Sequence, residues 1–214
     1  LRQEVPFVYA SSAAVYGLHH ASREEPALER PLNAYGWSKL VFDQHVRRVL
    51  RAARSTVVGL RYFNVYGPRE RQKGRMASMV HQIWRQLATE GRARLFEGTD
   101  GFGDGEQRRD FVFVDDVVRV NLFFAEGPAR RGVLNVGSGR SRSFNDVART
   151  IIGLRGEGEV EYVPFDRALD GKYQSFTEAD LGALRAAGFS APFTSLEDGV
   201  TASVAAWEGW PREA

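Results

Sequence analysis

The sequence of 214 residues contains no cysteine. Disulfide bonds, thiolate catalysis and cysteine-bound zinc are therefore excluded for these residues. The absence of cysteine fits a reducing compartment, and we expect a cytoplasmic protein. We also expect no metal site.

Long apolar runs and a strong charge imbalance are lacking too. No apolar run approaches the roughly 20 residues that a membrane-spanning helix needs. The net charge is only +2, with both signs spread along the chain, which gives little support for nucleic-acid binding. We therefore expect neither a membrane nor a nucleic acid as a partner. Hydrophobic residues make up 43% and charged residues 26%, a balance typical of a globular protein with a buried core.

Short apolar runs alternate with helical patterns along the chain. Runs rich in β-branched or aromatic residues predict buried strands at 7–10, 56–63 and 133–136. A helix is predicted from Asn33, its N-cap, to about residue 52, and others follow Gly74 and begin near Asp115. This alternation predicts an α/β fold with a parallel sheet.

Three Ser/Thr-x-x-Asp patterns predict helix starts in the second half of the chain. They begin at Ser143, Thr177 and Ser195. Gly188 is then expected to end the helix that starts at Thr177.

Tyr35 and Lys39 form a Tyr-x-x-x-Lys pair in the first predicted helix. Side chains four residues apart are neighbours on a helix, so the ammonium can lie beside the phenol. A neighbouring positive charge favours the phenolate, which suits a general acid/base. Tyr35, Lys39, Phe42 and Val46 also share one stripe of the helix, which predicts that the pair faces inward. Taken alone, the pair is equally explained by a core tyrosine beside a surface lysine.

Ser11 and Ser12 end the first predicted strand, where α/β sheets place ligand-binding groups. A strand that ends in Ser-Ser, followed by a helix with Tyr-x-x-x-Lys, resembles the Ser–Tyr–Lys triad of extended short-chain dehydrogenases. The resemblance implies that Ser12, Tyr35 and Lys39 are catalytic. It also implies that Tyr35 and Lys39 contact a nicotinamide cofactor.

Two further segments resemble the same extended family. Residues 61–69, Arg-Tyr-Phe-Asn-Val-Tyr-Gly-Pro-Arg, imply that Asn64 contacts substrate and that Val65 lies near the cofactor. Residues 108–116, Arg-Arg-Asp-Phe-Val-Phe-Val-Asp-Asp, imply a basic residue at the nucleotide diphosphate, and Arg109 is favoured because it directly precedes the Asp. Without the resemblance, these segments are a strand-to-loop exit and an edge strand with surface arginines.

Three segments narrow the resemblance to the ADP-glyceromanno-heptose 6-epimerase family. They are residues 73–78 (Lys-Gly-Arg-Met-Ala-Ser), 95–99 (Leu-Phe-Glu-Gly-Thr) and 171–181, which begins Gly-Lys-Tyr-Gln-Ser-Phe-Thr. The family implies that Lys73 is a second acid/base, on the side of the reacting carbon opposite Tyr35. The residues implied at the ADP-sugar site are Ser12, Asn64, Arg75, Gln82, Phe96, Glu97, Gly98, Thr99, Arg109 and Tyr173. Arg75 and Gln82 depart from one branch of the family, which has Ser and His there.

The resemblance implies epimerisation at C6 of ADP-heptose with bound NADP, as a step in lipopolysaccharide core synthesis. It implies part of a doubly wound parallel (Rossmann-type) sheet and a smaller C-terminal α/β substrate-binding domain. Residues 1–70 are assigned to the cofactor domain and 71–214 mainly to the substrate domain, with about 110–140 returning to the first. It also implies a homo-oligomer, typically a pentamer.

The Gly-rich turn that opens a dinucleotide-binding fold is missing from the few residues before Ser11. We therefore expect a fragment of a longer enzyme, without roughly 100 residues of βαβ units. Two alternatives stay open. One is another nucleotide-sugar epimerase or dehydratase, such as a UDP-hexose 4-epimerase, which has no reason to keep Lys73. The other is a non-catalytic fragment that only binds a nucleotide sugar.

Overall fold

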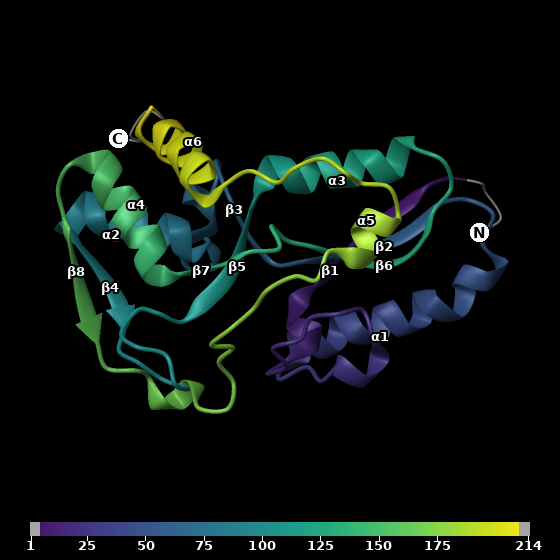
Figure 1. Ribbon diagram of the computed structural model, residues 1–214, viewed down its shortest axis with the longest axis horizontal. Coiled ribbons are helices and arrows are strands. Elements are labelled where there is room, and N and C mark those ends of the chain that lie inside the picture. The colour runs from purple at the N-terminus through teal and green to yellow at the C-terminus, as the bar shows by residue number, and fades with distance from the viewer. Residues whose placement is uncertain (1–4, 210–214) are drawn as a thin grey trace.

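The computed structural model describes residues 5–209 of the chain. Along its long axis, a parallel sheet flanked by helices lies at one end, and three helices with a two-stranded sheet lie at the other (Figure 1). The α/β class and the parallel sheet predicted from the sequence are confirmed. The division into domains at residue 70 stays a prediction.

The first sheet contains β1 (Phe7–Ser12), β2 (Val57–Tyr62) and β6 (Arg131–Val136) in the order β1-β2-β6. All pairs are parallel, and Ser12, Tyr62 and Val136 lie in register at the carboxyl ends of the strands. Helix α1 (Ala34–Val49) lies on one face, and α3 (Val114–Glu126) and α5 (Gly182–Ala186) lie on the other (Figure 1). The sheet therefore has helices on both faces, as doubly wound folds do.

The remaining strands form two small sheets. In the first, β5 (Arg108–Phe113) pairs parallel with β3 (Asn64–Tyr66) and antiparallel with β7 (Ser141–Ser143). In the second, β4 (Arg92–Phe96) pairs parallel with β8 (Glu159–Val163). Helices α2 (Met79–Glu90), α4 (Phe144–Arg155) and α6 (Leu196–Glu208) pack beside them. The short 3₁₀ helices are η1 (Ala13–Tyr16), η2 (Pro26–Leu28), η3 (Leu50–Ala52), η4 (Arg71–Met76) and η5 (Arg167–Leu169).

Two large hydrophobic clusters hold these parts together. One joins β2 and β6 to α3 and α5 through residues such as Leu60, Phe124, Val136 and Leu184. The other joins α2, α4 and α6 through Ile83, Leu87, Ile151, Val200 and Trp207. Burial of apolar surface at this scale is the dominant stabilising contribution to such a fold.

Local capping patterns predicted from the sequence are largely confirmed. The Asn33 side chain accepts a hydrogen bond from the Gly36 N–H at 2.9 Å, which caps α1. Ser143 and Asp146 form a reciprocal capping box at α4, and Ser195 caps α6. The helix predicted after Gly74 is α2, which is capped by Ser78 and begins at Met79, whereas Gly74 itself lies inside η4.

The helix start predicted at Thr177 is wrong. The Thr177 hydroxyl instead accepts a hydrogen bond at 3.2 Å from the N–H of Asp110, which lies in β5. Helix α5 begins only at Gly182, whose N–H donates to the Asp180 carboxylate at 2.8 Å. Gly188 follows the end of α5 with a φ of 96°, as predicted for a helix terminator.

The inward stripe predicted for α1 is wrong for Tyr35 and Phe42, although its Val46 is buried. Tyr35 is 57% exposed and Phe42 is 42% exposed. The buried face of α1 carries Gly36, Leu40, Asp43 and Val46. The reason is Asp43, a fully buried carboxylate that a hydrophobicity pattern assigns to the solvent side.

A charged network explains how Asp43 is buried. Its carboxylate accepts hydrogen bonds from the Arg61 guanidinium, the Ser11 hydroxyl and the Tyr9 hydroxyl, each at 2.9 Å. Arg61 also donates to Glu29 at 2.6 Å. Burial favours protonation of Glu29, but hydrogen bonds and charge from Arg47 and Arg61 outweigh it and lower its pKa. The network fastens α1 to β1 and β2.

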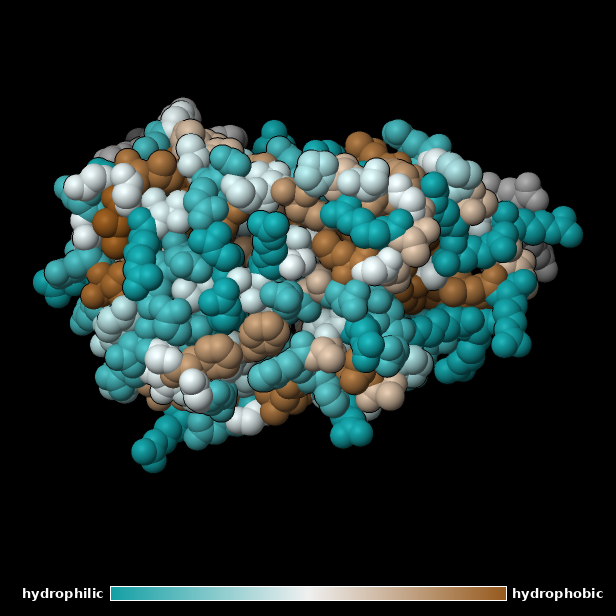
Figure 2. Space-filling model, in the orientation of Figure 1, coloured by the Kyte–Doolittle hydropathy of each residue, from teal (hydrophilic) through white to brown (hydrophobic). Residues whose placement is uncertain are grey.

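The molecular surface carries apolar side chains in small separate patches on the face shown in Figure 2. Several exposed apolar side chains belong to α1: Tyr35, Trp37, Val41 and Phe42. Within residues 5–209, no helix is long and apolar enough to cross a bilayer. The same range holds no group of three acidic, histidine or cysteine side chains that could bind a metal ion.

Candidate functional site

Ser12 lies at the carboxyl end of β1, where parallel sheets present ligand-binding groups. Its side-chain oxygen accepts a hydrogen bond from the Ala14 N–H at 3.1 Å and caps η1. The neighbouring Ser11 is buried and donates to Asp43, so its hydroxyl is already used. Of the two serines, Ser12 is therefore the one available to a ligand.

Tyr35 and Lys39 lie together on the first turns of α1. The Lys39 Nζ atom is 5.6 Å from the centre of the Tyr35 ring and donates to the Ala10 carbonyl at 3.1 Å. Because Ala10 belongs to β1, this bond places the ammonium at the same edge of the sheet as Ser12. Ser12, Tyr35 and Lys39 are thus brought to one place.

The first turn of α1 lies close to the chain that precedes it. A Cβ atom on Gly36 would lie 2.8 Å from the Ala14 carbonyl oxygen and 2.9 Å from the Pro31 Cβ. Such distances are shorter than van der Waals contact. Glycine at position 36 therefore allows the first turn of α1 to pack directly on the turn that follows Ser12.

The Tyr35–Lys39 pair fits the nicotinamide end of a dinucleotide. An ammonium has three donors, and the bond to Ala10 leaves donors of Lys39 available for the hydroxyls of a ribose. The exposed Tyr35 phenol stands beside it. Val65, the third residue predicted near the cofactor, lies in β3 and packs against the hydrophobic cluster of the parallel sheet.

Asn64 begins β3 and is exposed. The Thr177 hydroxyl donates to its side-chain oxygen at 3.5 Å. Because β3 follows β2 after a single residue, Asn64 lies just beyond the carboxyl edge of the parallel sheet. This position suits the predicted contact with substrate.

Three residues predicted to bind substrate form an aromatic and guanidinium cluster. The Arg109 guanidinium carbon lies 4.7 Å from the centre of the Tyr173 ring. The Tyr173 ring is 6.2 Å from Phe96 and 5.3 Å from Phe165, both in edge-to-face geometry. Burial raises the pKa of Tyr173, against the opposing charge of Arg109, so the phenol stays a hydrogen-bond donor. Burial also lowers the pKa of Arg109.

The turn after β4 carries the predicted residues Glu97, Gly98 and Thr99. The Glu97 N–H donates to Val163 at 2.8 Å, and the Gly98 N–H donates to the Asp104 carboxylate at 2.8 Å. The Thr99 carbonyl accepts from Phe102 at 3.0 Å. These bonds fix the turn beside Phe96.

A pocket of about 260 Å³ opens next to the aromatic cluster. Its lining comprises Leu18, His20, Asp100, Gly171, Tyr173, Gln174, Ser175 and Phe176. The Gln174 side chain donates to the Gly17 carbonyl, which joins the 171–181 segment to the loop after β1. Segments far apart in the sequence therefore meet at this pocket.

Lys73, Arg75 and Gln82 lie around the start of α2. The Gln82 amide donates to the carbonyls of Ala77 at 2.9 Å and Arg75 at 3.4 Å. The Lys73 side chain is 55% exposed, and its amine lies 3.8 Å from the Glu70 carboxylate. Within the described part of the chain, no hydrogen bond or ion pair joins Lys73 to Tyr35. Glu70 is a residue that sequence reasoning missed, although its place three residues before Lys73 was a usable signal.

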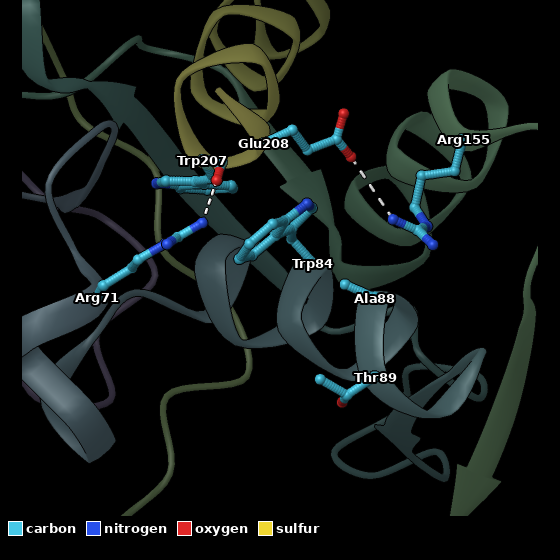
Figure 3. A pocket seen from close by; sticks show the side chains of 7 residues that line it. All are labelled: Arg71, Trp84, Ala88, Thr89, Arg155, Trp207 and Glu208. Carbon is cyan, nitrogen blue, oxygen red and sulfur yellow. Dashed lines mark hydrogen bonds and ion pairs between the residues drawn. The ribbon is translucent and has the colours of Figure 1, made fainter. Parts of the chain in front are cut away.

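A second pocket, of about 580 Å³, lies between α2, α4 and α6, and none of the predicted site residues line it (Figure 3). The indole rings of Trp84 and Trp207 are 5.1 Å apart there. Arg71 donates to the Trp207 carbonyl, and Arg155 lies 3.5 Å from Glu208 (Figure 3). The contact from Arg71 fastens η4, which contains Lys73, to the end of α6.

Comparison with known proteins identifies relatives that match nearly all of this chain. It is 56% identical over 198 residues to an ADP-L-glycero-D-manno-heptose-6-epimerase of Alkalilimnicola ehrlichii, covering 92% of this chain and 62% of that protein. The crystal structure of Helicobacter pylori ADP-L-glycero-D-manno-heptose-6-epimerase is similar, with a TM-score of 0.80 and 34% identity over 96% of this chain and 60% of that one. The chain thus spans about three fifths of the length of these relatives.

More distant relatives act on other nucleotide sugars. The structure of Thermus thermophilus UDP-glucose 4-epimerase in complex with NAD has a TM-score of 0.76 and 26% identity, over 96% of this chain and 64% of that one. Residues 1–137 match the model of the NAD dependent epimerase/dehydratase family. These matches cover well over half of the chain, in the part that holds Ser12, Tyr35, Lys39 and Asn64. The chain belongs to the NAD dependent epimerase/dehydratase family.

Proposed function

We propose that this chain forms the catalytic and substrate-binding part of an ADP-glycero-manno-heptose 6-epimerase. The observation that carries the proposal is the Lys39 amine, 5.6 Å from the Tyr35 ring, at the sheet edge that also holds Ser12. That arrangement suits proton transfer to and from a sugar hydroxyl. The 56% identity to an ADP-heptose epimerase supports the choice of substrate.

Inversion at an alcohol carbon requires the hydride to leave one face of that carbon and to return to the other, so the hydroxyl oxygen occupies two positions, and each is given its own acid/base here. Tyr35 takes or gives the hydroxyl proton on one face, with Lys39 stabilising the phenolate and Ser12 hydrogen-bonding the substrate oxygen. Lys73 serves the other face. A bound nicotinamide supplies hydride acceptance and return at C6. The transient ketone turns within the site between the two steps.

The aromatic and guanidinium cluster suits the ADP part of the substrate. Arginine binds phosphate oxygens through paired N–H groups, and Arg109 supplies this contact in the proposed site. The rings of Phe96 and Tyr173 offer apolar surface to a planar base. Asn64, Arg75, Gln82 and the 97–99 turn complete the proposed binding surface.

Five finer assignments are supported by resemblance to the ADP-heptose epimerase family. We propose NADP rather than NAD as the cofactor, and a homo-oligomer, typically a pentamer, as the assembly. We also propose a cytoplasmic location and a role in supplying heptose for the lipopolysaccharide inner core. The domain division at residue 70 is proposed on the same basis.

Epimer conversion tests the proposed function directly. The protein expressed from its complete reading frame is incubated with NADP⁺ and ADP-D-glycero-D-manno-heptose, and the epimers are resolved by chromatography. We expect the ADP-heptose to be converted to its L-glycero epimer. We expect no conversion of UDP-hexoses. Conversion of a UDP-hexose instead would indicate a related epimerase. Failure to bind NADP(H) in calorimetry would indicate a non-catalytic binding fragment.

Arg109→Met is expected to weaken ADP binding roughly 10- to 100-fold, because hydrogen bonds to charged groups contribute about 1.5–3 kcal/mol. Isothermal titration with ADP measures the change. Arg92→Met is the matched control, since Arg92 lies in β4 and pairs with Glu159 on the surface. Equal affinities in the two variants would contradict the role of Arg109. Thermal unfolding checks that Arg109→Met remains folded.

A further inference from the structure

Glu70 is a buried carboxylate in the loop that joins β3 to α2. The residue is only 2% exposed. One carboxylate oxygen accepts from the Gly67 N–H at 3.1 Å and from the Ser78 hydroxyl at 2.8 Å. The other accepts from the Ser78 N–H at 2.6 Å. Glu70 therefore joins the two ends of the loop, at Gly67 and at the cap of α2.

The loop held by Glu70 has an unusual backbone. Arg69 has a φ of 64°, a left-handed conformation that costs a non-glycine residue of the order of 1–3 kcal/mol. Gly74 has a φ of 54° and interrupts η4. Such conformations persist where the surrounding contacts over-determine them. The hydrogen bonds of Glu70 on either side of this segment supply those contacts.

Lys73 lies between these two unusual residues and contacts Glu70 twice. The Lys73 N–H donates to the Glu70 carbonyl at 3.0 Å. The Lys73 amine lies 3.8 Å from the Glu70 carboxylate oxygen that also accepts from the Ser78 N–H. The amine is thus the exposed partner of a buried, hydrogen-bonded anion. This ion pair is the polar contact that the structure describes for the Lys73 amine.

We propose that Glu70 is a positioning residue for Lys73, which orders the loop and orients the amine toward the substrate. The inference rests on the proposed function, in which Lys73 transfers a proton on one face of the reacting carbon. A small displacement of a catalytic group can cost up to about 10²-fold in rate. Glu70 touches neither substrate nor cofactor in this assignment and acts through Lys73.

Glu70→Gln tests the proposal. A glutamine keeps the size but replaces one accepting oxygen by an NH₂ group, so a hydrogen bond from Gly67 or Ser78 is lost together with the charge. Reduction of bound NADP⁺ is measured in a single turnover from each epimer separately. The half reaction that Lys73→Met loses is expected to fall roughly 10- to 100-fold in Glu70→Gln. The other half reaction and the Kd for ADP are expected to stay unchanged.

Glu90→Gln is the matched control. Glu90 is the last residue of α2 and pairs with Arg94 on the surface at 2.7 Å, so the same atoms change without contact to the loop. Both half reactions are expected to stay at the wild-type rate. Hydrogen exchange of peptides spanning residues 67–78 gives a second readout: faster in Glu70→Gln, and unchanged in Lys73→Met and Glu90→Gln.

Ser78→Ala covers the case in which Glu70→Gln does not fold. It removes one donor to Glu70 and the side-chain cap of α2 but keeps the carboxylate, so a smaller loss is expected in the same half reaction. Equal loss in both half reactions, or none in either, overturns the role of Glu70. If the wild type converts neither epimer, the proposed function itself fails. The positioning role alone fails if the wild type is active and Lys73→Met loses one half reaction, but Glu70→Gln loses neither.

Discussion

Replacing Tyr35 by Phe and Lys73 by Met in one protein is expected to abolish epimerisation, whereas each single variant retains one half reaction. A positioned acid/base contributes about 10²–10⁴-fold to a proton transfer, and the proposed function assigns one to each side of the carbon. Tyr35→Phe is expected to lose hydride transfer from one epimer, and Lys73→Met from the other. Single-turnover formation of NADPH from each purified epimer measures both half reactions.

Tyr162→Phe is the matched control for the tyrosine substitution. Tyr162 lies on β8, and its hydroxyl donates to Asn145 of α4 at 3.1 Å and takes no part in the proposed chemistry. Both half reactions are expected to be unaffected by this change. Full epimerisation by the double variant would show that the two-base assignment is wrong. Loss of both half reactions in Lys73→Met, with ADP binding retained, would show that Tyr35 and Lys73 do not act on separate faces.

Arg61→Met is expected to lower the free energy of unfolding by about 3–5 kcal/mol, because it leaves a buried carboxylate without its cation. Arg61 is fully buried and hydrogen-bonded to Asp43 and Glu29. The methionine fills much of the volume, so the loss reports the charge more than a cavity. Urea denaturation followed by circular dichroism measures the change.

Arg23→Met provides the comparison for a surface ion pair. Arg23 lies 3.4 Å from Glu25, and both side chains are more than half exposed. Such pairs contribute about 0–1 kcal/mol, so little change is expected. Adding Asp43→Leu to Arg61→Met should recover part of the lost stability, since no unpaired charge is then buried at that position. A loss for Arg61→Met as small as that for Arg23→Met would contradict the network described here.

Interactions within a few residues could be predicted from the sequence. The Asn33 cap and the Ser143 capping box depend on atoms three residues apart, and both are confirmed. The parallel α/β arrangement follows from the alternation of apolar runs and helical patterns, and it is confirmed too. Thr177 shows the limit of local patterns, because its hydroxyl is used by Asp110, far away in the sequence.

The orientation of α1 could not be predicted from periodicity. The pattern counts Asp43 as a solvent-facing residue, yet Arg61, on strand β2, makes its burial possible. The Tyr35–Lys39 pair consequently lies on an exposed side of the helix instead of its core face. Its outward position serves a proton-transfer role better than the predicted one, since a ligand can reach the phenol.

The substrate side of the site was predictable only through resemblance to a family. Phe96, Arg109 and Tyr173 come from three separate segments, and no spacing rule brings them together. The structure places them in one cluster, and their roles stay predictions. Glu70 was accessible to local reasoning, because an acidic residue three positions before a lysine in a helical turn is a pattern of known meaning.

The glycine at position 36 has a consequence for how this site tolerates change. The first turn of α1 rests on the carbonyl of Ala14 and on the ring of Pro31, without an intervening side chain. The seat of α1 on the turn that follows Ser12 is therefore set by this close contact. Substitutions elsewhere in the core can alter stability and leave that contact intact, whereas a single methyl group at position 36 pushes the first turn of α1 away from that turn.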